Sequence, residues 1–118
     1  MATTHLSSDL EKKLGIKTDQ LTKFCQTRQI IELALFGSIL RDDFHPDSDL
    51  DLLVTFDPTA KISLLDLVDM EFELEAICQR NIDLITKRAI EASPNWIRRQ
   101  EILTTATVIY ESRSSLST

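Results

Sequence analysis

The chain has 118 residues spanning 1–118, and its 42% hydrophobic and 27% charged content is that of one soluble globular domain. Its formal net charge of −6 disfavours direct binding of DNA or RNA, because lysine and arginine supply most of the affinity for phosphates. No apolar run approaches the roughly 20 residues that cross a bilayer, and no signal-peptide core is evident, so we expect a cytoplasmic protein without membrane contact. In that reducing compartment Cys25 and Cys78 are expected to be buried free thiols rather than a disulfide.

Hydrophobic periodicity, capping residues, glycine and proline predict helices and short strands along the whole chain. Ser8 and Glu11 have the spacing of a capping box for a first helix, which is expected to stop at Gly15. Thr18 is expected to cap a second helix. In chain order, the expected elements are a helix over 8–14, a helix from 18, a strand over 30–36, a loop over 39–48, a strand over 49–56, a helix over 63–79, a strand over 81–86, a helix beginning near 94 and a short β segment over 107–110.

The longest expected helix, over 63–79, carries apolar residues at helical spacing on one face. This face is predicted to enter the core, with acidic residues covering the rest of the helix. The residues that form the predicted core face are Leu65, Val68, Phe72 and Ala76.

The C-terminal part of the chain carries aromatic and basic residues. Trp96 and Tyr110 are expected to pack inside the protein. Arg98 and Arg99 fit either a partner contact or ordinary surface charge. A flexible polar tail is expected over 112–118. The order of elements predicts an α/β (α+β) domain in which a small mixed sheet is flanked by helices.

Two aspartates at the start of the second predicted strand are candidate metal ligands. Alternate residues of a strand share a face, so Asp49 and Asp51 are expected to point the same way while Leu50 enters the core. Neighbouring carboxylates repel each other unless a cation lies between them. Oxygen ligands of this kind suit Mg²⁺ bound together with substrate phosphates. The pair therefore predicts a platform for a metal–triphosphate.

A glycine and a serine follow the first predicted strand. Gly37 lets the backbone approach a ligand closely, and backbone N–H groups with the Ser38 hydroxyl could hold an anion at the start of a helix. Arg41 could neutralise phosphate charge. Asp83, on the strand over 81–86, would join the two aspartates if that strand lies beside theirs. It could then ligate a metal or accept a proton from an attacking hydroxyl.

The aspartates also fit two other interpretations, a calcium-binding loop and a solvent-exposed position. The alternating aspartates from Asp47 resemble the start of a calcium loop, but Leu52 and Pro58 stand where an EF-hand needs glycine and glutamate. The aspartate of the third strand could simply face solvent. Neither interpretation accounts for the glycine and serine at a fixed distance before the aspartate pair.

The combined pattern resembles the signature of the nucleotidyltransferase superfamily related to DNA polymerase β. That signature is Gly-Ser, about ten residues, Asp-x-Asp on a strand and a third aspartate on a later strand. The chain is most similar to the stand-alone bacterial minimal nucleotidyltransferases, called MNT proteins, from about residue 18 to 111, and the resemblance implies a polymerase β-like fold. The matching residues are Gly37 and Ser38, then after ten residues Asp49 and Asp51, and later Asp83.

The resemblance also implies a function. MNT proteins typically act as antitoxins of HEPN-domain ribonuclease toxins, and some transfer AMP from ATP to a toxin tyrosine. By this likeness we expect a magnesium-dependent enzyme with two ions, ATP as substrate and a HEPN toxin as partner in a hetero-oligomeric complex. The resemblance assigns metal binding and catalysis to Asp49, Asp51 and Asp83, and nucleotide binding to Gly37, Ser38 and Arg41.

The segment after Gly-Ser departs from the family pattern, in which alanine and glycine flank the arginine. Here Leu40 is bulkier than alanine, and Asp42 replaces glycine and adds a negative charge near the phosphate loop. A second function therefore stays open, in which the chain neutralises the toxin by steric occlusion without catalysis. A transferase acting on a small molecule such as an aminoglycoside is least expected, because such enzymes tend to carry an extra substrate-binding domain.

Overall fold

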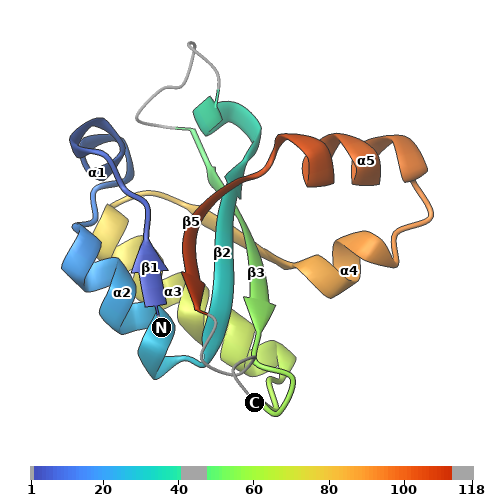
Figure 1. Cartoon of the computed structure of the whole chain (residues 1–118), viewed down its shortest axis with the longest axis horizontal. Helices are drawn as coiled ribbons and strands as arrows, with labels where there is room; N and C mark the ends of the chain where they lie inside the picture. The colour runs from blue at the N-terminus through green and yellow to red at the C-terminus, as the bar shows by residue number, and fades with distance from the viewer. Residues whose placement is uncertain (1, 41–47, 113–118) are drawn as a thin grey trace.

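The computed structural model describes residues 2–40 and 48–112, with the side chain of Ser38 excepted. The described part of the chain forms five strands, five α-helices and one 3₁₀ turn (Figure 1). They are β1 (Ala2–Thr4), α1 (Ser8–Leu14), α2 (Thr18–Thr27), β2 (Ile30–Phe36), η1 (Gly37–Leu40), β3 (Leu50–Phe56), α3 (Leu64–Cys78), β4 (Ile82–Thr86), α4 (Lys87–Glu91), α5 (Trp96–Thr105) and β5 (Thr107–Ser112).

The strands form one mixed sheet in the order β1-β5-β2-β3-β4. All neighbouring pairs are antiparallel except β3 and β4, which are parallel and connected through α3. A parallel pair needs such a crossover because its connection must return to the starting edge of the sheet. The expected α/β domain with a small mixed sheet and flanking helices is confirmed. Two short elements, β1 and α4, were not predicted from the sequence.

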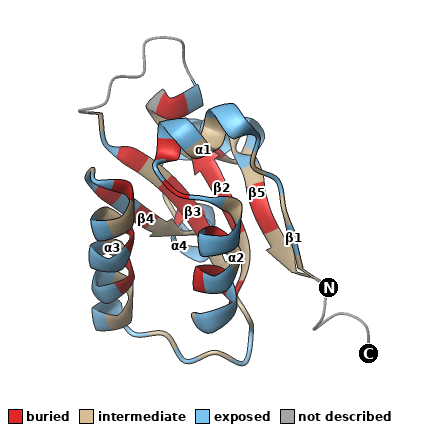
Figure 2. Ribbon diagram, turned by 90° about the vertical axis from the view of Figure 1, so that its left-hand side faces the viewer, coloured by how far each residue is buried: buried red, intermediate tan, exposed pale blue. Residues whose placement is uncertain are grey.

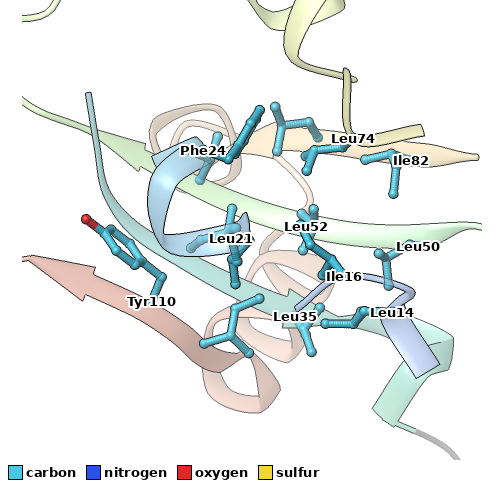
Figure 3. Close-up of a cluster of buried hydrophobic side chains, with 14 of the residues drawn as sticks. Leu14, Ile16, Leu21, Phe24, Leu35, Leu50, Leu52, Leu74, Ile82 and Tyr110 are labelled. Carbon is cyan, nitrogen blue, oxygen red and sulfur yellow. The ribbon is translucent and has the colours of Figure 1, made fainter. Parts of the chain in front are cut away.

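Helices cover both faces of the sheet, so the core has two parts. On one face, α1, α2 and α3 pack their apolar residues against the sheet, including Leu21, Phe24 and Leu74 (Figure 3). On the other face, α4 and α5 contribute Ile90 and Ile102 to a smaller cluster. The central strands of the sheet are therefore buried on both faces, as expected from their apolar residues. No helix in the described ranges 2–40 and 48–112 is long and apolar enough to span a membrane.

The alternation predicted for the second strand is observed in β3. Leu50 and Leu52 lie in the larger core, whereas Leu53 lies in the smaller one on the α4–α5 side. Because alternate residues share a face, Asp51 is on the α4–α5 side together with Leu53. This strand therefore fixes the side of the sheet on which its acidic residue lies.

The prediction for the buried face of α3 was wrong. Leu65 is 80% exposed and Phe72 is 64% exposed, whereas Met70 and Leu74 are buried against the sheet. Figure 2 shows exposed residues along the outer side of α3. The helix is apolar on two opposite faces, so periodicity alone could not tell which one the sheet covers.

Two hydrogen bonds to the edge strand explain the rotation of α3. The backbone N–H of Leu84 donates to Glu71 Oε2 at 2.8 Å, and that of Ile82 donates to Glu75 Oε2 at 3.1 Å. These N–H groups lie on the outer edge of β4, where no further strand can accept from them. With both glutamates turned to this edge, Leu74 must face the sheet.

The helix starts differ from the predicted caps. Ser7, not Ser8, caps α1 by accepting from the Leu10 N–H at 3.2 Å. Glu11 instead accepts from the backbone N–H and hydroxyl of Thr18 at 2.8 and 2.9 Å. Glu11 thus joins the two helices instead of closing a capping box. Lys17, not Thr18, is the N-cap residue of α2, and its backbone N–H donates to Gln20 Oε1 at 2.9 Å.

The remaining predictions have mixed outcomes. Cys25 and Cys78 are buried free thiols, and Tyr110 is buried, as expected. Trp96 is 61% exposed, so its predicted interior position was wrong: it starts α5, beyond the edge of the smaller core. Residues 113–118 of the predicted tail lie outside the described residues.

Truncating a side chain on the buried face of α3 should cost much more stability than truncating one on its exposed face. We expect Leu74→Ala to lower the free energy of unfolding by about 2–5 kcal/mol, because it opens a cavity in the larger core. Phe72→Ala should change it by less than about 0.5 kcal/mol, because the ring is mostly in solvent already. Urea unfolding of both variants measures the difference, and equal losses would contradict the observed rotation of α3.

Candidate active site

Two carboxylates face each other across the parallel strands. Asp51 of β3 is in register with Asp83 of β4, and on its other side Asp51 pairs with Phe36 of β2. Residues in register on adjacent strands share a face, so both aspartates lie on the α4–α5 side of the sheet. Asp49 is exposed and comes just before β3, at alternate spacing with Asp51. The three aspartates expected from the sequence therefore converge at one end of two neighbouring strands.

Gly37 lies directly against the carboxylate of Asp51. Its φ of +82° is a backbone conformation that residues with a Cβ rarely adopt. A Cβ at this position would also stand 2.3 Å from Asp51 Oδ2, well inside contact distance. Both the turn and the close approach require glycine. The predicted Gly-Ser turn and the predicted metal platform are thus one structural unit.

Burial raises the pKa of Asp51 above its ordinary value. The negative charges of Asp83 and then Asp49 raise this pKa further. The three carboxylates are therefore close enough to repel one another. A divalent cation would relieve that repulsion, which is why the donor set fits Mg²⁺.

The candidate metal ligands of the described residues do not form a complete protein cage. Within residues 2–40 and 48–112, no group of three or more Asp, Glu, His or Cys side chains is positioned to hold a metal ion by itself. Mg²⁺ is usually bound by one or two carboxylates together with substrate phosphates and water. Asp51 with one neighbour fits that mode, in which the nucleotide completes the coordination.

Arg98 of α5 is a cation near the site that the sequence did not assign. Its charge lowers the pKa of Asp51, against the effect of the neighbouring carboxylates. The next residue, Arg99, has a different position, because its Nη1 donates to the Ser93 carbonyl at 3.0 Å. Arg98 thus acts on the aspartates, whereas Arg99 binds the turn before α5. The only sequence signal for this was the pair itself, since its distance from Asp51 depends on how α5 packs.

A hollow opens beside Gly37, between the η1 turn and α5. Its volume is roughly 550 Å³, within the range of pockets that take small ligands. It lies on the α4–α5 side, next to the glycine that touches Asp51. The residues that line it are Gly37, Leu40, Glu101, Thr105 and Thr107.

Part of the predicted phosphate loop lies outside the described residues. Ser38 lies in the four-residue 3₁₀ turn after β2, and its side chain is not described. Arg41 and Asp42 lie outside the described residues, so their roles stay predictions. Within the described residues, Gly37 therefore starts a short 3₁₀ turn that offers backbone N–H groups.

A protein-family model matches most of the chain. Residues 18–108 match the model of the nucleotidyltransferase domain. This range contains every candidate site residue named above.

Similar proteins were found among sequences and structures. The chain is 36% identical to the protein adenylyltransferase MntA of Thermococcus cleftensis over 83 residues, which covers 70% of this chain and 82% of that protein. Matches to four putative protein adenylyltransferases of Methanocaldococcus jannaschii span only 59–62% of their lengths. A putative minimal nucleotidyltransferase of known structure superposes with a TM-score of 0.61 at 25% identity, covering 88% of this chain and 97% of that one.

A further structure is similar in fold. It is a chain from a complex of tri-AMPylated Shewanella oneidensis HEPN toxin with MNT antitoxin, with a TM-score of 0.52 and 15% identity. The match covers 82% of this chain and 71% of that chain.

Gly37 offers a first test of the site. We expect Gly37→Ala to weaken binding of ATP with Mg²⁺ at least about tenfold, because the new methyl group would collide with the Asp51 carboxylate. Gly15→Ala is the matched control, since Gly15 has a φ of +73° but lies against Cys78, away from the aspartates. The control should lose stability and keep its affinity per folded molecule. Calorimetric titration measures the affinity of each variant for ATP with Mg²⁺. Equal affinity of the two variants would contradict the assigned role of Gly37.

Asp51 offers a second test, through stability. Because its pKa is raised in the folded state, the ionised carboxylate costs stability at neutral pH, and this cost disappears as the pH falls and the group is protonated. We expect Asp51→Asn to raise the melting temperature of the metal-free protein by a few degrees at pH 7, with a smaller gain at pH 4. Adding Mg²⁺ should stabilise the native chain but not the variant.

The control for this experiment is Asp57→Asn. Hydrogen bonds from the Thr59 hydroxyl and backbone N–H lower the pKa of Asp57, so its ionised form is favoured in the folded state. This variant should gain no stability at pH 7. A gain as large as that of Asp51→Asn would remove the evidence for carboxylate repulsion at the site.

Proposed function

The chain belongs to the nucleotidyltransferase domain family, and from this we propose that it is an antitoxin that transfers AMP from ATP to a tyrosine hydroxyl of a HEPN-domain toxin. The observation that carries the proposal is the juxtaposition of Asp51, Asp83 and Gly37 on one side of the sheet. A carboxylate pair with a glycine backbone in contact with it suits binding of a metal–triphosphate. A carboxylate whose pKa is raised by burial and by like charges is also a common mark of a functional site.

The choice of acceptor rests on the relatives. The archaeal relative that covers most of this chain is named a protein adenylyltransferase. The Shewanella complex is described as holding an AMPylated HEPN toxin. Together they support a protein hydroxyl as acceptor and a HEPN toxin as partner. The same two descriptions support ATP as the nucleotide that donates AMP.

We assign the residues as follows. Asp49 and Asp51 hold Mg²⁺ with the triphosphate, and the backbone at Gly37 approaches the phosphates. When bound, Mg²⁺ neutralises phosphate charge and orients the triphosphate. Ser38 and Arg41 would add further phosphate contacts. Arg98, whose charge acts on Asp51, is suited to balance negative charge on the departing pyrophosphate.

The transfer itself exchanges one bond for another. The tyrosine oxygen forms a bond to the α-phosphorus of ATP, and the bond from that phosphorus to the bridging oxygen breaks, releasing pyrophosphate. The proton of the tyrosine hydroxyl passes to a base, for which Asp83 is the candidate because it is exposed and lies opposite Asp51. Asp83 could instead act as a further metal ligand, in which case water takes the proton.

A binding antitoxin without catalysis is the second candidate function. It is favoured by the segment after Gly-Ser, where Asp42 stands in place of the family's glycine. The bulky Leu40, which is 41% exposed at the end of the turn, also departs from the family pattern. In this function the toxin would be neutralised by occlusion, and the aspartates would be a remnant.

One experiment separates the two functions. A HEPN-domain toxin from the source organism is incubated with this chain, ATP and Mg²⁺, and the intact mass of the toxin is measured. We expect a gain of one or more AMP units, which should vanish with Asp49→Asn/Asp51→Asn because the charges that hold the metal are removed. Asp57→Asn, at the other end of the same strand, is the matched control and should leave the gain unchanged.

The contrary result has a clear form. If the native chain adds no mass, yet both it and the double variant suppress the toxin through a stable complex, the chain is a binding antitoxin. If the double variant still transfers AMP, the assignment of the aspartates is wrong.

A further inference from the structure

Exposed apolar side chains gather on α3. Of the seven large hydrophobic residues that are exposed in the described part of the chain, four lie on this helix, on about two turns. Such a concentration differs from singly scattered surface residues, which need no explanation. The four are Leu64 at 77% exposure, Leu65 at 80%, Val68 at 37% and Phe72 at 64%, and we call them the α3 outer face.

The position of this face follows from the helix geometry. At roughly 100° per residue, Leu65 and Phe72 point within about 20° of each other. Phe72 and Leu74 point about 160° apart, and Leu74 is the residue buried against the sheet. The hydrogen bonds of Glu71 and Glu75 to β4 hold the helix in this rotation. The α3 outer face therefore cannot turn into the core without breaking them.

Carboxylates border the α3 outer face on both sides. Glu71 and Glu75 lie along the border next to β4, where they accept from its backbone. Asp69 and Glu73 lie along the border next to α2, where both form ion pairs with Arg28. All four are thus held in place by neighbouring elements, so the charge pattern around the apolar residues is fixed.

This pattern selects among possible occupants. A second copy of the chain would bring its own acidic borders against these carboxylates, and the overall charge of −6 adds to the repulsion. An anionic lipid surface or nucleic acid is disfavoured for the same reason. An amphipathic helix with a lysine- or arginine-flanked apolar stripe is complementary in both apolar surface and charge.

We propose that the α3 outer face is a docking surface for a helix of the partner protein, in which basic residues flank an apolar stripe. Naming that partner as the HEPN toxin rests on the proposed function. The aspartates lie on the α4–α5 side of the sheet and α3 covers the opposite side. The partner helix bound on α3 is therefore separate from the partner segment that presents the acceptor hydroxyl. The partner passes around the β4 edge to reach both sides of the sheet.

The test compares binding to the HEPN protein by calorimetry. We expect Leu65→Ser/Phe72→Ser to weaken binding at least about 100-fold, because both side chains lie at the centre of the outer face. Ile97→Ser is the matched control, since Ile97 is 62% exposed but lies on α5. The control should bind within about twofold of the native chain. Raising the salt concentration from about 0.05 to about 0.5 M should weaken native binding, because the borders are charged.

The double variant must also keep its fold and its active site. Both side chains are mostly in solvent, so its melting temperature should be unchanged or higher, and ATP with Mg²⁺ should stabilise it as much as the native chain. Unchanged binding of the double variant, or an equal loss in Ile97→Ser, overturns the docking surface. In that case an AMP gain in the mass experiment would still support the proposed function. A native chain that forms no complex overturns the docking surface as well.

Discussion

Two hydrogen bonds from the outer edge of β4 to glutamates of α3 connect most features of this protein. They satisfy backbone N–H groups that an edge strand leaves without partners, and they fix the rotation of the crossover helix. That helix joins the parallel strands β3 and β4, in which Asp51 lies in register with Asp83. The placement of the aspartates on one side of the sheet and of the α3 outer face on the other thus both depend on how α3 packs on β4.

The site is built at a cost in stability. Asp51 carries a carboxylate whose pKa is raised by burial and by two like charges, and Gly37 adopts a conformation that most residues avoid. Proteins retain such local conflicts where function needs them and compensate elsewhere. Here the compensation is the dense packing of the central strands on both faces of the sheet. The like charges and the close approach of the Gly37 backbone together make this region suited to bind a cation and a phosphate.

The two faces of the sheet divide the proposed tasks. The α4–α5 side holds the aspartates, Arg98 and the hollow beside Gly37, which suits binding of a nucleotide. The opposite side carries α3 with its acidic borders, which suits a basic helix of a partner. A partner held on α3 would stay bound before and after a transfer event at the aspartates. Occlusion and modification of a toxin are therefore compatible within one complex.

The sequence by itself determined every strand except β1, the spacing of glycine and aspartates, and the family to which the chain belongs. These are local properties, because strand periodicity places Asp49 and Asp51 on one face wherever the strand lies. The register of Asp83, the proximity of Arg98 and the buried side of α3 required the tertiary structure. Leu65 and Phe72 are as apolar as Met70 and Leu74, so only the glutamate bonds to β4 decide which pair the sheet covers. Trp96 was misplaced for a similar reason, since its exposure follows from where α5 starts beyond the smaller core.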